Sequence, residues 1–347
     1  MQLQPINKAY FSCQTQQWFE TNGISEVWAF NIPLRVQFRG VKSRSGLIFR
    51  GACGLGEFAP FWEYQPKEAS SWLLSALECA TLPPPPPKRN SVPINTIIPV
   101  VPPEKAAKLA LQNGAFTAKI KVADPRVTLE EDAERVGAVA DSLRGEFGEA
   151  ARVRVDANGA WGPEEALRAI DVLANAAGGL EYVEQPCQTV EELAFVRKNS
   201  DVLIAADESI RRADDPFLVA EAKAADLAIV KVAPLGGMRR ALLVAEQLGM
   251  PVVVSSAVDT VVGLAAGVQL AAALPDLPFA CGLGTGSLLT QDVAKPLLPK
   301  NGSLDVREAT KSLQVRLETK ESGGLFAFDW GPWVQRLEEV VSWLTHQ

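Results

Sequence analysis

Four charged residues follow short apolar runs at nearly regular intervals in the middle of the chain. They are Asp156, Glu184, Asp207 and Lys231, separated by steps of 28, 23 and 24 residues. Each step has the length of one strand, one helix and two loops. A charge at the carboxyl end of a buried parallel strand is costly unless it faces a site, and in a β/α barrel all such ends open on one mouth. The spacing therefore predicts that these side chains meet in a single pocket.

The three carboxylates have the chemistry of a magnesium site. Asp156, Glu184 and Asp207 would offer hard oxygen ligands without imidazole or thiolate, which favours Mg²⁺, with Mn²⁺ as an alternative, and disfavours zinc. Two polar neighbours are further candidates. Asn158 would orient a ligand or contact the substrate, or else form a loop turn, and Glu208 would support the metal ligands from behind or cap a helix.

Three lysines are candidate catalytic groups. The alternation of a strand points Lys119 and Lys121 to the same side, and Lys231 ends another apolar run. Lys121 and Lys231 are expected on opposite sides of the mouth with the metal between them. Nearby positive charge and desolvation both lower the pKa of a lysine, so either could act as a base near neutral pH. The pocket is predicted to remove a proton next to a metal-bound carboxylate and to stabilise the resulting enediolate.

Composition excludes several other classes of site. The only histidine is His346, so a Ser-His-Asp triad and histidine-ligated zinc are excluded. The five cysteines are scattered without C-x-x-C spacing, which indicates reduced thiols. A net charge of −7 disfavours nucleic acid as a partner, and no apolar stretch approaches the ~20 residues that span a bilayer. We expect a cytoplasmic enzyme with a small-molecule carboxylate substrate and leave its oligomeric state open.

Four segments are predicted along the chain. Residues 1–24 form a polar, Gln-rich N-terminal extension, 25–90 an α+β capping domain, 91–300 a barrel, and 301–347 a C-terminal segment that packs back on the cap. The proline run at 83–87 marks the linker between cap and barrel. Strands and helices alternate after Val92, which means either a barrel or a doubly wound sheet. Charges at many consecutive strand ends favour the barrel, because an open sheet concentrates its site at one switch point. The eight strand candidates are Ile94–Val100, Thr117–Val122, Val153–Asp156, Tyr182–Glu184, Leu203–Asp207, Leu227–Val232, Val252–Ser255 and Phe279–Cys281.

The charged motifs together resemble the enolase superfamily, in its muconate-lactonizing-enzyme-like subgroup. The motifs that carry the resemblance are Lys119-Ile-Lys121, Asp156-Ala-Asn158, Glu184-Gln-Pro186, Asp207-Glu-Ser209 and Lys231 followed by Val-Ala-Pro-Leu-Gly-Gly. The resemblance implies a modified (β/α)₇β TIM barrel under an α+β cap. It also implies that Lys121 abstracts the proton, Lys231 stabilises the enediolate from the opposite face, and Lys119 lies near the substrate carboxylate.

Within that subgroup the chain is similar to members that dehydrate 2-succinyl-6-hydroxy-2,4-cyclohexadiene-1-carboxylate to o-succinylbenzoate, in menaquinone or phylloquinone biosynthesis. Segments that carry this likeness include Gly56-Glu-Phe-Ala-Pro-Phe61 and Val92-Pro-Ile-Asn-Thr96. By the same likeness Arg39, Ser255 and Gly282 are candidate substrate contacts; Arg39 otherwise ends a strand, and small residues also suit a crowded barrel rim.

Two alternatives stay open. An N-acylamino acid racemase or another epimerase of the subgroup would use the same lysines and metal, although dipeptide epimerases usually carry Asp-x-Asp where this chain has Cys281-Gly-Leu283. A non-catalytic barrel is the alternative from a different class, and it predicts the loss of a ligand or lysine, yet all six positions are filled.

Overall fold

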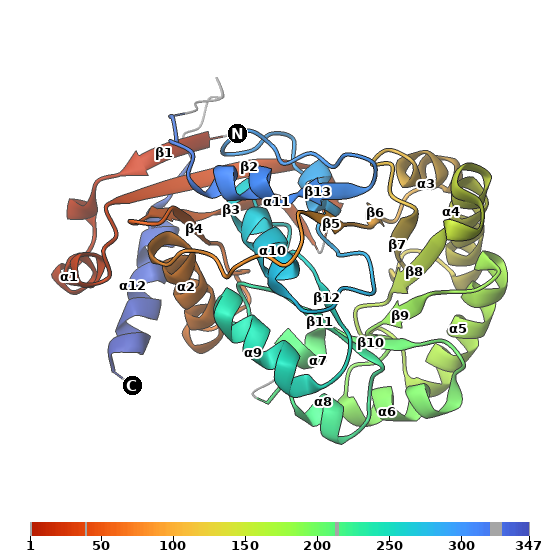
Figure 1. Cartoon of the computed structure of the whole chain (residues 1–347). Coiled ribbons are helices and arrows are strands. Elements are labelled where there is room, and N and C mark those ends of the chain that lie inside the picture. The colour runs from red at the N-terminus through yellow and green to blue at the C-terminus, as the bar shows by residue number, and fades with distance from the viewer. Residues whose placement is uncertain (1, 39, 212–214, 320–327, 347) are drawn as a thin grey trace.

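The protein consists of a β/α barrel beside a smaller sheet-and-helix cap (Figure 1). The computed structural model describes residues 2–38, 40–211, 215–319 and 328–346. The N-terminal strands, α2 (Pro66–Thr81) and the C-terminal helix α12 (Gly331–Thr345) lie together on the cap side. No helix within these residues combines the length and apolarity needed to cross a membrane.

The barrel sheet contains seven parallel strands whose order in space follows their order in the chain. A doubly wound sheet would reverse direction at a switch point, and this sheet does not. The prediction of a barrel is therefore confirmed. The strands are β6 (Thr96–Ile98), β7 (Thr117–Lys121), β8 (Arg152–Asp156), β9 (Tyr182–Glu184), β10 (Ile204–Ala206), β11 (Leu227–Val230) and β12 (Val252–Val254).

The eighth barrel position is reduced to two residues. Cys281 makes a parallel bridge with Ile94, and Gly282 makes one with Ser255, so the segment closes the ring between β12 and the first strand. The predicted strand Phe279–Cys281 is thus only a pair of isolated bridges. The predicted strand Ile94–Val100 is shorter in the structure, where β6 covers Thr96–Ile98. A separate short strand before it, β5 (Ser91–Pro93), pairs antiparallel with β13 (Ser303–Asp305).

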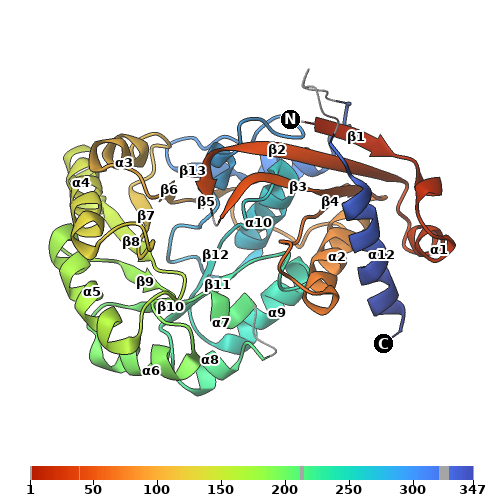
Figure 2. The same cartoon turned by 180° about the vertical axis from the view of Figure 1, so that it is seen from behind.

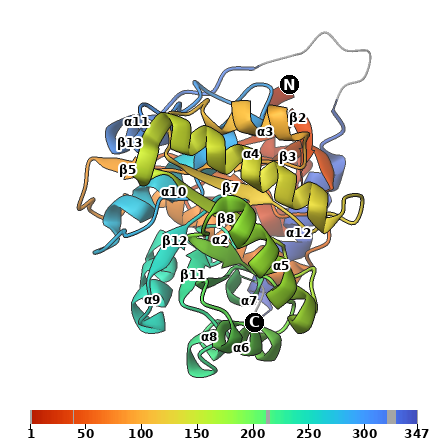
Figure 3. The ribbon, with the colours of Figure 1, turned by 90° about the vertical axis from the view of Figure 1, so that its right-hand side faces the viewer.

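Helices cover the outside of the sheet, as the side view in Figure 3 shows. In α5 (Pro163–Ala177), Pro163 occupies the first turn, Gly178 ends the helix in a left-handed conformation, and the buried residues recur at helical spacing on one face. Local sequence therefore sets both the ends of this helix and the face that packs on the strands. The other helices are α3 (Pro103–Ala110), α4 (Leu129–Phe147), α6 (Val190–Asn199), α7 (Glu208–Arg211), α8 (Leu218–Glu221), α9 (Met238–Leu248), α10 (Val261–Ala273) and α11 (Val306–Leu313).

The cap contains a four-stranded antiparallel sheet, seen from behind in Figure 2. Its order is β1 (Gln2–Ile6), β2 (Glu26–Phe38), β3 (Val41–Arg50) and β4 (Leu55–Phe58). The N-terminal segment is not a separate extension in space, because β1 pairs with β2 along its whole length and α1 (Cys13–Thr21) follows it. The side chains of Leu3 and Ile6 are buried, so β1 contributes to both neighbouring cores.

Helices α2 and α12 pack against the cap sheet. Trp333 on α12 is fully buried, and its ring meets that of Phe58 edge-on at 6.2 Å between centroids. Trp72 on α2 lies in the same apolar cluster. The proline run at 83–87 has neither helix nor strand and leads from α2 to the barrel.

Candidate active site

The charged strand ends predicted from the sequence lie next to one another in the barrel. In the parallel registers, Lys121 on β7 pairs with Asp156 on β8, and Asp156 pairs with Glu184 on β9. Because successive side chains alternate, Lys119 points to the same face as Lys121. A pocket at the barrel mouth is lined by Lys119, Lys121, Asp156, Glu184, Asp207, Lys231, Ile97, Ser255, Ser256, Val258 and Thr285.

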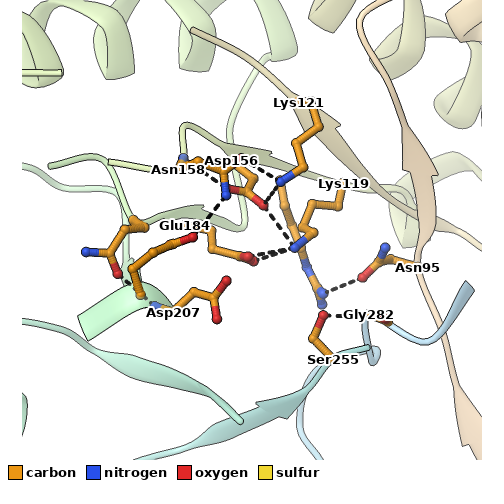
Figure 4. Close-up of polar contacts among 12 residues, drawn as sticks. Asn95, Lys119, Lys121, Asp156, Asn158, Glu184, Asp207, Ser255 and Gly282 are labelled. Atoms are coloured by element: carbon orange, nitrogen blue, oxygen red, sulfur yellow. Dashed lines mark hydrogen bonds and ion pairs between the residues drawn. The ribbon is translucent and has the colours of Figure 1, made fainter. Parts of the chain in front are cut away.

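Two lysines converge on the first pair of carboxylates, as Figure 4 shows. The Lys119 ammonium lies 2.7 and 2.8 Å from the two Glu184 oxygens and 3.2 Å from Asp156 Oδ2. The Lys121 ammonium lies 2.5 Å from the same Asp156 oxygen and 2.7 Å from Asn158 Oδ1. Asp156 therefore bridges the two lysines.

The third carboxylate has cations on both sides. Lys231 Nζ lies 2.5 Å from each oxygen of Asp207, and Arg211 on α7 donates through Nε to Asp207 Oδ1 at 3.2 Å. All three side chains are buried. Three strands separate β11 from β7 in the sheet, so Lys231 and Lys121 approach the pocket from different sides.

Because this cluster is buried, the pKa of each group depends strongly on the charges beside it. Burial raises the pKa of Glu184 to about 7, and the neighbouring Asp156 carboxylate adds to the rise. Burial also acts to raise the pKa of Asp156, but the Lys121 and Lys119 ammonium groups hold it well below 3.8. Burial acts to lower the pKa of Lys119, whereas Glu184 and Asp156 raise it above its ordinary 10.5. Lys119 therefore stays protonated among these carboxylates. The lowered pKa that a lysine needs to act as a base is not found at Lys119.

The donor chemistry of the cluster fits a hard divalent cation. Asp156, Glu184 and Asp207 provide only oxygen donors and are all buried, and burial together with the two neighbouring carboxylates raises the pKa of Glu184. Within the described part of the chain, no three His, Cys, Asp or Glu side chains are arranged around a common point as metal ligands are. The lysine ammonium groups lie against the carboxylate oxygens instead.

Asn158 and Glu208 join the same network. Asn158 has a left-handed backbone (φ 50°), and its N–H donates to Asp156 Oδ1. Its amide group accepts from Lys121 and donates to Glu208 Oε1 at 3.3 Å. Glu208, the first residue of α7, also pairs with Arg211. Asn158 therefore forms the loop turn and bonds Lys121 and Glu208, and its contact with a ligand or substrate stays a prediction.

The predicted substrate contacts differ in whether they face the pocket. Ser255 lines the pocket. The Gly282 N–H instead donates to Val254 O at 2.8 Å and so closes the barrel, and a Cβ at this glycine would lie 2.5 Å from Ser255 Oγ. Gly282 is therefore required because its backbone lies close to Ser255, which is the alternative of a small residue at a crowded barrel rim. Its N–H does not face the pocket. Arg39 lies outside the described residues.

Three residues that were not among the predicted site residues, Gln185, Arg211 and Tyr64, form hydrogen bonds around the candidate metal ligands. Gln185 is fully buried; its side-chain oxygen accepts from the backbone N–H groups of Asp207 and Ser209, and its nitrogen donates to Ser209 Oγ. Arg211 connects Asp207 to the cap by donating to the Tyr64 hydroxyl at 2.5 Å. A polar amide between Glu184 and Pro186 at a buried strand end was a usable signal for Gln185. The Arg211–Tyr64 contact joins residues 147 positions apart and leaves no local pattern.

Family models match most of the chain. The model for the enolase C-terminal domain-like family matches residues 103–310, and the enolase N-terminal domain-like model matches residues 29–80. The o-succinylbenzoate synthase of Thermobifida fusca (strain YX) is 54% identical over 293 residues, which cover 84% of this chain and 90% of that protein. The o-succinylbenzoate synthase of Mycobacterium tuberculosis (strain ATCC 25618 / H37Rv) is 50% identical over 288 residues, covering 83% and 86%.

A more distant solved structure has the same fold. The dipeptide epimerase from Enterococcus faecalis V583, complexed with Mg and the dipeptide L-Leu-L-Tyr, superposes with a TM-score of 0.67 at 22% identity, covering 82% of this chain and 97% of that one. At this level of identity the likeness concerns the architecture alone.

Proposed function

The chain belongs to the enolase superfamily and, within it, to the o-succinylbenzoate synthase family, and on that premise we propose how its residues carry out the synthase reaction. The reaction is dehydration of 2-succinyl-6-hydroxy-2,4-cyclohexadiene-1-carboxylate to o-succinylbenzoate, in menaquinone or phylloquinone biosynthesis. The observation that carries this assignment is 50–54% identity to o-succinylbenzoate synthases over more than four fifths of the chain.

Lys121 is the proposed base. Its ammonium lies at the open edge of the cluster, with 14% of its side chain exposed against 7% for Lys119, so it is the more accessible of the two lysines on β7. As a neutral amine it takes the proton from the ring carbon that bears the carboxylate.

Lys231 and Lys119 stabilise the charge that develops. Lys231 approaches from the opposite side of the mouth, and its ammonium offsets the negative charge of the enediolate. Lys119 stays cationic between Glu184 and Asp156 and is placed to attract the substrate carboxylate. The C–O bond to the ring hydroxyl then breaks, the Lys121 ammonium returns its proton to the departing oxygen, and water and the aromatic ring result.

We propose Asp156, Glu184 and Asp207 as the residues that hold Mg²⁺, or Mn²⁺ in its place. The chemistry that such an ion supplies when bound is polarisation of the substrate carboxylate, which acidifies the adjacent C–H. Glu208 and Asn158 orient Asp156 and Lys121 through their hydrogen bonds. Ser255 is the proposed contact for the succinyl side chain from the opposite wall.

A spectrophotometric assay tests this function. Loss of the cyclohexadiene substrate is followed with Mg²⁺ and with a chelator, and we expect turnover only with the metal. Lys121→Ala should abolish turnover. Deuterium incorporation into N-acylamino acids, measured in parallel, tests racemase activity. Racemisation without dehydration would refute the proposal in favour of an epimerase.

A further inference from the structure

One wall of the active-site pocket is made by the loop between β12 and α10, residues 255–260. Ser255, Ser256 and Val258 from this loop line the pocket opposite the carboxylates, together with Thr285. The Ser256 and Thr285 hydroxyls are 2.5 Å apart. The shape of this loop therefore sets the space left for a substrate.

Val258 holds an unfavourable backbone conformation at the centre of that wall. Its φ is 62°, in the left-handed region, and β-branched residues rarely adopt it because Cβ crowds the backbone. Val258 is also fully buried. Such a conformation persists only where surrounding contacts over-determine it, and it is common where a site requires a fixed shape.

Two side chains bond the backbone of Val258 directly. Within the loop, its N–H donates to Ser256 Oγ at 3.1 Å. From the cap, Arg44 Nε donates to its carbonyl oxygen at 3.1 Å, across 214 positions of sequence. The Arg44 contact therefore ties a cap strand to the strained residue in the pocket wall.

Arg44 is itself rigidly held. It lies on β3 and is only 3% exposed, its Nη2 donates to Ala59 O at 2.7 Å, and its guanidinium carbon lies 4.5 Å from the centre of the Phe61 ring. A buried guanidinium is costly, and the carbonyl groups of Ala59 and Val258 partly compensate for that cost. The cap thus presents a fixed donor to the loop.

The far end of the loop is held by a second cap residue. Glu57 on β4 accepts from Thr260 Oγ1 at 2.6 Å, from Thr260 N at 3.1 Å and from Gly263 N at 3.0 Å. These donors form the N-terminus of α10, where a carboxylate is favoured. With this end of the loop held by Glu57, the hydrogen bond from Arg44 is the contact from the cap to Val258 itself.

We propose that Arg44 is a positioning residue that holds Val258 in the left-handed conformation, so that the cap sets the shape of the pocket wall and Val258 determines which substrates fit. This inference rests on the proposed function, because its main readout is KM for the cyclohexadiene substrate. Arg44 does not line the pocket, and its hydrogen bond to the loop is to the Val258 carbonyl oxygen, so we expect its effect on substrate fit to pass through the loop.

A double-mutant cycle tests the clamp. Glycine adopts a φ near +60° without strain, so in a Val258→Gly background the loop no longer needs Arg44. We expect Arg44→Met to raise KM about tenfold in the wild-type background with a smaller change in kcat, and by less than about twofold in the Val258→Gly background. An equal rise in KM in both backgrounds would overturn the proposal.

Arg336→Met provides the matched control. Arg336 on α12 also donates to cap carbonyl groups, those of Phe61 and Tyr64, but bonds nothing in the loop. Its substitution should weaken the cap, and Val258→Gly should not relieve that loss. If Val258→Gly rescues Arg336→Met as fully as Arg44→Met, the effect is general and the clamp is refuted.

A second readout separates the clamp from the proposed function. Hydrogen exchange of the amides at 256–260 should accelerate in Arg44→Met and stay unchanged in Arg336→Met, whether or not the wild type dehydrates the substrate. If Arg44→Met does not fold, Arg44→Lys and Ser256→Ala, which each remove one bond to Val258, replace it in the cycle. Unaltered exchange in the loop would refute the clamp even if the wild type is an active synthase.

Discussion

Replacing Lys119 by methionine tests whether the carboxylate cluster depends on added positive charge. Methionine preserves the length of the side chain but removes the ammonium that contacts Glu184 and Asp156. Breaking a buried ion pair on one side costs about 3–5 kcal/mol, because the partner is left buried and uncompensated. For a chain of 347 residues that corresponds to a fall in melting temperature of roughly 4–7 °C in the presence of chelator.

The dependence on pH and metal distinguishes this cause from a packing defect. The pKa of Glu184 is already raised to about 7 with Lys119 in place, and loss of the lysine raises it further. At pH 6 Glu184 is protonated in the folded variant and the penalty is small, and the penalty grows as the pH rises above 7, where the wild-type carboxyl ionises beside Lys119. Mg²⁺ at 100 times its dissociation constant should restore about 2.7 kcal/mol.

Differential scanning calorimetry at pH 6 and pH 8, with Mg²⁺ and with chelator, measures all of these effects. Lys198→Met on the exposed face of α6 is the control, and it should change stability by about 0.5 kcal/mol or less under every condition. The reasoning would be refuted if Lys119→Met lost the same stability at both pH values, or melted like the wild type at pH 8 in chelator.

Three further predictions follow from individual contacts. Burial and Asp259 raise the pKa of Glu57 from 4.5 to about 7, so between these pH values the folded protein keeps a proton that the unfolded chain releases. The free energy of unfolding should therefore fall by roughly 3 kcal/mol as the pH rises from 4.5 to 7, and Glu57→Gln should remove this contribution in urea titrations. Trp333→Ala should cost about 3–5 kcal/mol in the same titrations, against about 1 kcal/mol for Trp343→Ala on the exposed part of α12. Arg211→Met should raise the Mg²⁺ dissociation constant about 10- to 100-fold by calorimetric titration, because Asp207 loses an orienting partner, and an unchanged constant would contradict that role.

Strand ends were the most predictable part of this protein. The carboxyl ends of parallel strands meet at one side of the sheet, so the positions of Asp156 and Glu184 in sequence suffice to predict that they are neighbours. Tyr182–Glu184 was predicted with its observed bounds, and the barrel follows from the same alternation. These features depend on local patterns and on one rule of topology.

Segments whose partners lie far away in sequence were less predictable. β1 has only Leu3 and Ile6 as buried anchors, with Pro5 between them, so its sequence lacks strand alternation; it forms at the sheet edge, where proline is tolerated, because β2 offers a free edge. The closing segment at Cys281 and Gly282 likewise depends on Ile94 and Ser255, which only the complete ring brings alongside it.

The same distinction divides the active site into two kinds of residue. The reactive groups lie on strands of the barrel, where each strand fixes one or two side chains at the mouth. Other contacts reach the site from the cap: Tyr64 accepts from Arg211, which bonds Asp207, over 147 positions, and Arg44 donates to Val258 in the pocket wall over 214 positions. A change in the cap can therefore alter the pocket without altering its reactive groups. For this fold we expect substitutions in the barrel to change the chemical step and substitutions in the cap to change substrate fit.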